Sequence, residues 1–252
     1  MPYRFLGRNL IMVITGTYAS VVLRRPNHYT AVLPNKLNAA TKAIFLLHGF
    51  GFDEQSWLHN TPLVQYSEKY NVAFFSPDAG ISFYTDHIDG QNYGEAIGKE
   101  FYEEMQRVFN LDMTRENTAI AGFSMGGYGS VLLGLRFSQF YGWIGGFSPA
   151  FVFYKKERNE AHFNHVFSKG DYGSENDVLV RYQELLESDS PIPSIIFTCG
   201  VEDPLCQQTE NIIQQLKEID PKARIEFKTQ SGFHDFSLWK NDLSMFLEKF
   251  AK

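Results

Sequence analysis

The chain has 252 residues, of which 44% are hydrophobic, 21% charged and 15% aromatic. This composition excludes a disordered, collagen-like or coiled-coil protein, and the length suffices for one sizeable buried core. The formal net charge of -6 has the wrong sign for binding a phosphate backbone, so no nucleic acid partner is expected. No apolar run approaches the ~18 residues that cross a bilayer, so no membrane partner is expected either.

The first residues only weakly imitate a signal peptide. Arg4 and Arg8 precede an apolar run at 10–14, which is shorter than the ~7–15 residues of a signal-peptide core. We therefore expect residues 1–11 to be an N-terminal extension, with Met12 as an alternative start, and a cytoplasmic location.

The two cysteines, Cys199 and Cys206, are too few for a disulfide scaffold. We interpret them as reduced thiols, as expected in a reducing compartment. A disulfide between them and the oligomeric state, including a homo-oligomer, stay open.

Short β-like runs alternate with longer helical ones along the chain. An antiparallel pair of strands is expected first, at 12–24 and 28–33, with a break at Arg25-Pro26-Asn27. Further strands are predicted at 43–47, 72–75, 118–121, 142–145, 195–198 and 224–228. Helical periodicity predicts helices at 55–69, 93–110, 125–137, 206–219 and 236–250. This order predicts an α/β fold with a mostly parallel sheet, an antiparallel N-terminal edge and helices on both faces.

We expect a single domain over residues 1–252. Residues 149–190 break the alternation, with mixed charges and one helical stretch. They are predicted to form a small insertion over the sheet and the site.

The most informative motif is Gly122-Phe123-Ser124-Met125-Gly126-Gly127. It fits GxSxG, the nucleophile elbow, and lies between a predicted strand and a predicted helix. The turn is so tight that glycines are needed on either side of the serine. The serine oxygen then stands clear of the sheet at the N-terminus of a helix, which stabilises negative charge. The motif predicts that Ser124 is a catalytic nucleophile.

A second glycine-containing loop, His48-Gly49-Phe50-Gly51, follows the apolar strand at 43–47. Such a loop can aim a backbone N–H into the space above the nucleophile. We predict that the N–H groups of Phe50 and Met125 form an oxyanion hole, in which each donor lowers the barrier by ~3–4 kcal/mol. His48 is an alternative base, but we interpret it as a residue that braces the loop.

The base and the acid are expected at the same edge of the sheet as the serine. His234 lies between the last predicted strand and the last predicted helix, and loops at the carboxyl ends of parallel strands meet at one edge. Asp203 directly follows the strand at 195–198 and gives the order serine, aspartate, histidine. We predict His234 as the base and Asp203 as the acid, with Glu202 as the alternative acid.

Two aromatic residues are weaker candidates for substrate binding. Tyr84 lies in the loop at 82–86, and Trp57 begins the helix that follows the oxyanion loop. Asp86 and Asp89 do not have the spacing of a calcium loop, so no metal is predicted. The chemistry needs no cofactor.

Several strings carry a family resemblance from about residue 15 to the C-terminus. They are His48-Gly49-Phe50-Gly51, Ser56-Trp57, Pro77-Asp78, Ser82-Phe83-Tyr84-Thr85-Asp86, Ala121-Gly122-Phe123-Ser124-Met125-Gly126-Gly127-Tyr128-Gly129, Cys199-Gly200-Val201-Glu202-Asp203 and Gly232-Phe233-His234-Asp235-Phe236 with Trp239. Together they resemble the tributyrin esterase / esterase D family of α/β-hydrolases, which is related to feruloyl and acetyl-xylan esterases and to S-formylglutathione hydrolase.

That resemblance implies an α/β-hydrolase fold, a triad of Ser124, Asp203 and His234, and oxyanion N–H groups from Phe50 and Met125. One departure concerns the substrate. S-formylglutathione hydrolases usually carry Thr-Cys after the oxyanion glycine, whereas this chain has Phe50-Gly51-Phe52, which counts against formylglutathione.

The expected function is a serine carboxylesterase that hydrolyses small-molecule esters with short acyl chains. The predicted insertion is short and highly charged, which disfavours a long apolar channel. One alternative is a feruloyl or acetyl sugar esterase, or an acyltransferase of the same fold. Another is a non-catalytic hydrolase-fold binding protein, which the intact set of serine, acid and histidine argues against.

Overall fold

One eight-stranded sheet organises the computed structural model, which describes residues 12–151, 161–167 and 174–252. The strands lie in the order β1-β2-β4-β3-β5-β6-β7-β8. Their bounds are β1 (Met12–Ser20), β2 (Arg25–Leu33), β3 (Lys42–Leu47), β4 (Val72–Pro77), β5 (Thr118–Phe123), β6 (Trp143–Phe147), β7 (Ser194–Gly200) and β8 (Ile225–Gln230). β1 and β2 pair antiparallel, as do β2 and β4, and all other neighbours are parallel. The predicted sheet, with its antiparallel N-terminal edge, is confirmed.

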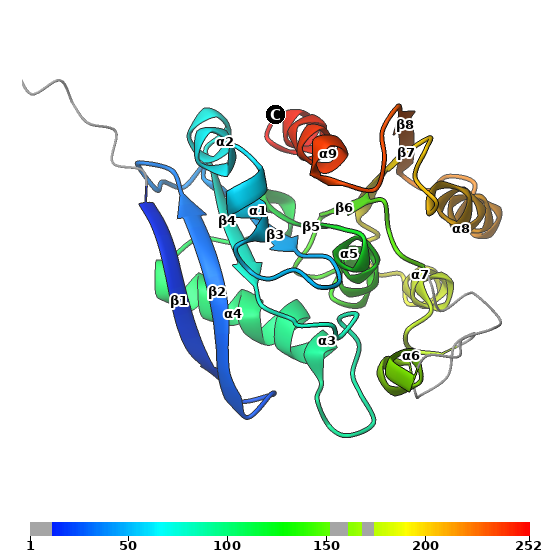
Figure 1. Ribbon diagram of the computed structural model, residues 1–252, viewed down its shortest axis with the longest axis horizontal. Coiled ribbons are helices and arrows are strands. Elements are labelled where there is room, and N and C mark those ends of the chain that lie inside the picture. Colours follow the sequence, from blue (N-terminus) through cyan, green and yellow to red (C-terminus); the bar gives the residue numbers. More distant parts are fainter. Residues whose placement is uncertain (1–11, 152–160, 168–173) are drawn as a thin grey trace, which may run out of the picture.

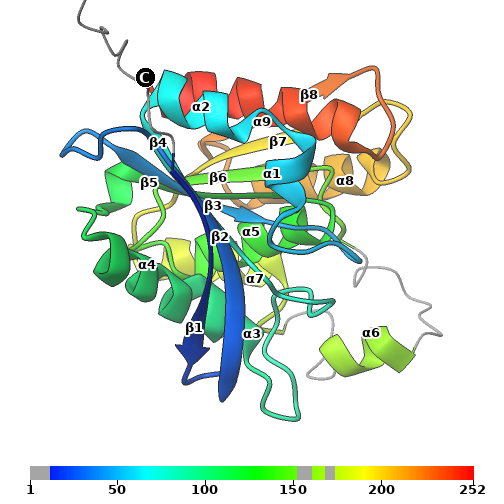
Figure 2. The same ribbon diagram turned by 60° about the vertical axis from the view of Figure 1, so that its left-hand side comes forward.

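Helices cover both faces of this sheet (Figures 1 and 2). Their bounds are α1 (Ser56–Asn60), α2 (Leu63–Tyr70), α3 (Tyr93–Glu95), α4 (Phe101–Phe109), α5 (Met125–Arg136), α6 (Ala161–Val166), α7 (Val178–Glu187), α8 (Cys206–Ile219) and α9 (Phe236–Phe250). Residues of α1, α2 and α9 form one apolar core, and residues of α4, α5, α7 and α8 form the other. Among the helices of the described ranges, none is long and apolar enough to cross a membrane.

The central strand β3 shows why the sheet needs a helical layer on each side. Phe45 and Leu47 belong to one core, whereas Ile44 and Leu46 belong to the other. All four side chains are at most 1% exposed. A strand buried on both faces has the continuous apolar sequence seen here rather than an alternating one.

The first hairpin turns earlier than predicted. Its turn lies at 21–24, and the residues predicted as the break begin β2. Pro26 has no N–H to donate to a neighbouring strand. It is tolerated in β2 because it lies opposite Ala19 of β1, before the residues of β2 that pair with β4. The Glu100 carboxylate accepts hydrogen bonds from the Val21 and Val22 N–H groups, at 2.6 and 3.2 Å. The turn is therefore stabilised by a residue far away in the sequence.

Two predicted helices are interrupted. The helix expected at 55–69 is divided into α1 and α2 at Pro62, which has no N–H to continue the hydrogen-bond ladder. The helix expected at 93–110 contains a π-helical turn, Ala96–Glu100, between α3 and α4.

The region at 149–190 contains two described helices, α6 and α7, where one was predicted. The charged run from Lys155 to Glu160, on which the expectation of a small acyl pocket partly rested, lies outside the described residues.

Candidate active site

Ser124 occupies the sharp turn between β5 and α5. Its backbone has φ 55° and ψ -117°, a conformation that is strained for a residue with a Cβ. A Cβ on Gly122 would lie 2.4 Å from the carbonyl oxygen of Gly126. A Cβ on Gly126 would lie 2.4 Å from the carbonyl oxygen of Leu47. Only glycine fits both positions, as the elbow motif requires.

The three predicted triad side chains form one continuous hydrogen-bonded line. His234 Nε2 lies 2.9 Å from Ser124 Oγ, and His234 Nδ1 lies 2.7 Å from Asp203 Oδ2. Because the carboxylate accepts, Nδ1 carries the proton and Nε2 presents its lone pair to the serine hydroxyl. This is the arrangement that a general base needs to activate a serine.

The residues predicted as acid and base lie on two loops whose backbones approach each other closely. Asp203 follows β7, and His234 lies between β8 and α9. A Cβ on Gly200 would lie only 1.9 Å from the carbonyl oxygen of Gly232. Glycine at 200 is therefore what allows the acid loop and the base loop to meet.

Asp203 is held as a carboxylate. Burial acts to raise its pKa, but hydrogen bonds from His234, from Ser148 and from the backbone N–H of Leu205 outweigh that effect, so the pKa is lowered. The Leu205 N–H lies 2.8 Å from Oδ1. The lowered pKa favours the ionised form of Asp203, which can accept a hydrogen bond from the neighbouring imidazole.

Ser148 supports Asp203 and was missed by the sequence reasoning. It directly follows β6, has φ 45°, and its N–H donates to the carbonyl oxygen of Thr198 at 2.8 Å. Its Oγ accepts a hydrogen bond from Trp239 Nε1 at 3.2 Å. Its position after a parallel strand, at the same edge as Ser124, was the signal available in the sequence.

Glu202, the alternative acid, has different partners. Its exposed carboxylate accepts hydrogen bonds from the Gly232 N–H at 2.6 Å and from Ser231 Oγ at 3.1 Å. These bonds lower the pKa of Glu202, the Gly232 bond contributing most. Glu202 therefore fastens the loop that carries His234, while Asp203 contacts the imidazole itself.

His48, the alternative base, is fully buried and has partners at both ring nitrogens. Nε2 accepts from the Ala79 N–H at 3.0 Å, so Nδ1 carries the proton and donates to the carbonyl oxygen of Gly49 at 2.9 Å. Burial lowers the pKa of His48. A neutral imidazole with these partners braces the loop after β3.

The two residues predicted to form the oxyanion hole follow the ends of two neighbouring strands, β3 and β5. Phe50 is on the turn after β3, where Gly51 has φ 79° and the Phe52 N–H donates to the Gly49 carbonyl oxygen. Met125 is the first residue of α5, and N–H groups in a first helical turn have no acceptor within the helix. The oxyanion role of both residues stays a prediction.

The two residues predicted to bind substrate are placed elsewhere. Trp57 and Tyr84 are both completely buried. Trp57 Nε1 donates to the Leu47 carbonyl oxygen at 3.1 Å, and the Tyr84 hydroxyl donates to the His48 carbonyl oxygen at 2.9 Å. A side chain with no exposed surface cannot contact a substrate, so the structure does not support the predicted substrate-binding role of these two residues. Their hydrogen bonds instead support the end of β3 and the loop that follows it.

Comparison with known proteins identifies the family of the chain. Residues 15–250 match the model of the esterase family described as "Putative esterase". The chain is 31% identical over 224 residues to the acetyl esterase of Caldicellulosiruptor saccharolyticus, covering 84% of each protein.

Solved structures agree in fold. The substrate-bound fluorophosphonate-binding serine hydrolase F of Staphylococcus aureus superposes with a TM-score of 0.86 at 23% identity, covering 96% of this chain and 99% of that one. The S-formylglutathione hydrolase of Staphylococcus aureus gives 0.85 at 23% identity, covering 96% and 100%. A ferulic acid esterase gives 0.81 at 21% identity, covering 96% and 98%. The family resemblance predicted from the motifs is confirmed: the chain belongs to the esterase family, and it is a carboxylic ester hydrolase of the serine type with an α/β-hydrolase fold.

Proposed function

We propose that this esterase hydrolyses short-chain acyl esters through a triad of Ser124, His234 and Asp203. The observation that carries the proposal is the unbroken line of hydrogen bonds from Ser124 Oγ through the imidazole to Asp203 Oδ2, at 2.9 and 2.7 Å. The strained backbone of Ser124 supports it further, because strain of this kind gathers at functional sites.

In the first half of the reaction, His234 Nε2 takes the proton of Ser124 Oγ as that oxygen attacks the ester carbonyl carbon. The negative charge that develops on the carbonyl oxygen is accepted by the N–H groups of Phe50 and Met125. The imidazolium then gives its proton to the departing alcohol, and the acyl group remains on Ser124.

In the second half, water takes the place of the alcohol. His234 accepts a proton from the water, whose oxygen attacks the acyl carbon, and returns a proton to Ser124 Oγ as the carboxylic acid leaves. Asp203 keeps the imidazole in the Nδ1–H tautomer and stabilises the imidazolium. Its lowered pKa supports this role, because a protonated acid could not accept from Nδ1.

The preference for short acyl groups rests on one relative. The relative that is 31% identical to this chain is described as an acetyl esterase, and acetyl is a short acyl group.

An aromatic acyl group is the second candidate, and exposed aromatic side chains favour it. Phe50 is 47% exposed and Phe233, which precedes the base, is 65% exposed. Exposed rings beside a reacting centre can stack on a planar acyl group such as ferulate. Formylglutathione is disfavoured, because this chain has Phe50-Gly51-Phe52 where S-formylglutathione hydrolases usually carry Thr-Cys after the oxyanion glycine.

Two measurements test the proposal. A fluorophosphonate probe, followed by peptide mass spectrometry, should form its adduct on Ser124 and form none in Ser124→Ala. The rates on p-nitrophenyl acetate, butyrate and octanoate and on methyl ferulate then separate the candidates. A maximum at methyl ferulate would replace the short-chain proposal by the aromatic one, and an adduct at another serine would overturn the triad.

A further inference from the structure

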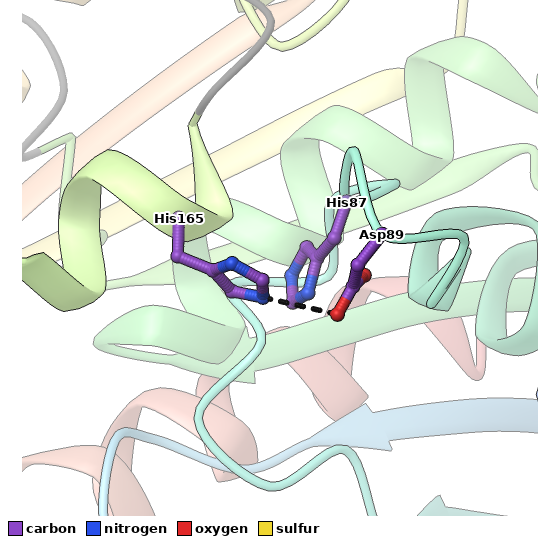
Figure 3. Close-up of side chains that lie close together, drawn as sticks. All are labelled: His87, Asp89 and His165. Carbon is purple, nitrogen blue, oxygen red and sulfur yellow. Dashed lines mark ion pairs between the residues drawn. The ribbon is translucent and has the colours of Figure 1, made fainter.

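Two histidines and one aspartate gather outside the active site, where the loop after β4 meets helix α6. His87 and Asp89 come from the loop and His165 comes from α6, and the three side chains point toward one another (Figure 3). One ligand atom from each lies within 4.8 Å of the other two. We propose that this cluster binds a divalent transition-metal ion, with Zn²⁺ as the preferred ion.

The separation of two of these ligands already suits zinc. His165 Nε2 lies 3.4 Å from Asp89 Oδ2. Tetrahedral zinc with bonds of ~2.1 Å places its ligand atoms about 3.4 Å apart. The spacing of this pair therefore matches that of two ligands on one zinc ion.

The third ligand is oriented by its own hydrogen bond. His87 Nε2 lies 3.0 Å from the carbonyl oxygen of Ser82, so Nε2 carries the proton and Nδ1 carries the lone pair. Histidines that bind metals usually donate the other ring N–H to a carbonyl or carboxylate oxygen in this way. The His87 ring is buried, and its centroid is 5.0 Å from that of His165.

The loop that carries two of the ligands is held in place. Asp89 Oδ1 accepts from the Gln91 N–H at 3.1 Å, which leaves Oδ2 directed at His165. The His87 N–H donates to the Gln91 carbonyl oxygen at 3.1 Å. Next to the turn, Asp86 forms a 2.6 Å ion pair with Arg136 of α5. A site whose loop is already ordered loses little conformational entropy when an ion binds.

The donor set decides between metals. Two imidazole nitrogens and one carboxylate oxygen suit zinc and its neighbours in the transition series, whereas calcium and magnesium prefer oxygen ligands only. A hollow of about 260 Å³ lies beside the cluster, lined by Ile81, Ser82, His87, Gln91, Tyr93 and His165. Three protein ligands and this hollow leave the fourth position to water. The side chains of His165 and Asp89 are nearly half exposed, which gives the ion access.

The ion would join two segments that are distant in the sequence. Phe163, on the same helix as His165, packs on Phe83 with ring centroids 5.5 Å apart, and Phe83 packs on Phe50 at 6.2 Å. Zinc at the cluster would therefore fix α6 against the loop that supports Phe50. Ester hydrolysis by the proposed triad involves no metal, so this role is structural.

The test is a titration of the full-length chain, freed of metal with a chelator, with zinc chloride in a calorimeter at neutral pH. We expect one zinc per chain. His165→Ala and Asp89→Asn should each weaken the affinity at least about tenfold. His59→Ala is the control variant: it removes an exposed histidine of α1 whose Nε2 contacts Gln55 Oε1 at 3.2 Å, and it should bind zinc like the wild type.

Cobalt in place of zinc should give the strong visible absorption of a four-coordinate ion.

Hydrogen exchange gives a second readout that does not depend on activity. Zinc should slow exchange in peptides from the loop at 85–92 and from α6, and leave the hairpin of β1 and β2 unchanged. Three results would each overturn the proposal: no zinc binding by the wild type, equal binding by His165→Ala and Asp89→Asn, or an equal loss in His59→Ala.

Discussion

The indole Nε1–H of Trp239 donates a hydrogen bond to Ser148 Oγ over 3.2 Å. The same indole packs edge-on against the His234 ring, with centroids 4.9 Å apart. The Ser148 side chain in turn helps to lower the pKa of the Asp203 carboxyl. One residue of the C-terminal helix thus contacts the proposed base and, through Ser148, supports the proposed acid.

Ser148→Ala should slow the reaction without unfolding the protein. Hydrogen bonds to charged groups contribute ~1.5–3 kcal/mol, which corresponds to a roughly tenfold to hundredfold loss in kcat. KM should change little, because Ser148 acts through Asp203. Ser130→Ala is the matched control: Ser130 is a buried serine whose Oγ donates to carbonyl oxygens of Gly127 and Gly145, away from the acid. An equal loss of kcat in both variants would reduce Ser148 to a structural residue.

Ser124→Ala and His234→Ala should each abolish nearly all turnover, by ~10⁴–10⁶-fold, because nucleophile and base act as one unit. Circular dichroism should show that the fold is intact. A His234→Ala enzyme that kept more than about a tenth of the wild-type rate would point to another base, although the proximity of the Nε2 atom to Ser124 argues for a complete loss.

The two adjacent acids should differ. Asp203→Asn should lower kcat far more than Glu202→Gln, because an amide at 203 favours the wrong imidazole tautomer. Glu202→Gln weakens only the bonds to Gly232 and Ser231, so its main effect should be on thermal stability. Steady-state kinetics of the two variants decide the matter, and the reverse order would transfer the acid role to Glu202.

Asp242 should make the fold less stable as the pH rises. Burial raises its pKa from 3.8 to about 7, so the folded state keeps a proton that the unfolded chain has already lost. The stability that this proton provides is therefore complete below about pH 4 and is lost as the pH rises to about 7. Asp242→Asn removes the ionisation and should preserve the hydrogen-bonding partner Gln230. Melting temperatures of the two proteins should agree in acid, and the variant should be the more stable at pH above about 7. An offset that does not vary with pH would contradict this account.

Among p-nitrophenyl esters, kcat/KM should be highest from acetyl to butyryl and fall steeply by octanoyl. Each methylene that no longer fits loses up to about 0.8 kcal/mol of burial. A series of esters measured under one set of conditions tests this, and activity that still increased at decanoyl would require a long apolar cleft.

The sequence predicted best where the signal is local. The bounds of α8 and α9 agree with the predicted 206–219 and 236–250, since a regular apolar stripe runs the length of each helix. Prediction failed at the first turn, because a distant residue, Glu100, holds it in place. It also failed at 55–69, although Pro62 is a local signal that one helix ends and another begins there.

The candidate site shows the same division. Ser124, Asp203 and His234 could be chosen because each follows a predicted parallel strand, and such strand ends share an edge. Ser148 shares this position but carries no motif. The cluster of His87, Asp89 and His165 could not be found, because no spacing in the sequence brings α6 to the loop after β4. Trp57 and Tyr84 contact the end of β3 and the residue after it, but that both side chains are fully buried is a property of the assembled core.

The two loops that meet at Gly200 and Gly232 both lie in the last part of the sequence. The proposed catalytic groups therefore come from two separate parts of the chain. The proposed nucleophile and the predicted oxyanion N–H groups belong to segments up to α5, whereas the proposed acid and base follow the last two strands. With this triad, a chain that ends before β7 would have its serine but no base beside it. We therefore expect hydrolytic activity only after the C-terminal segment has docked.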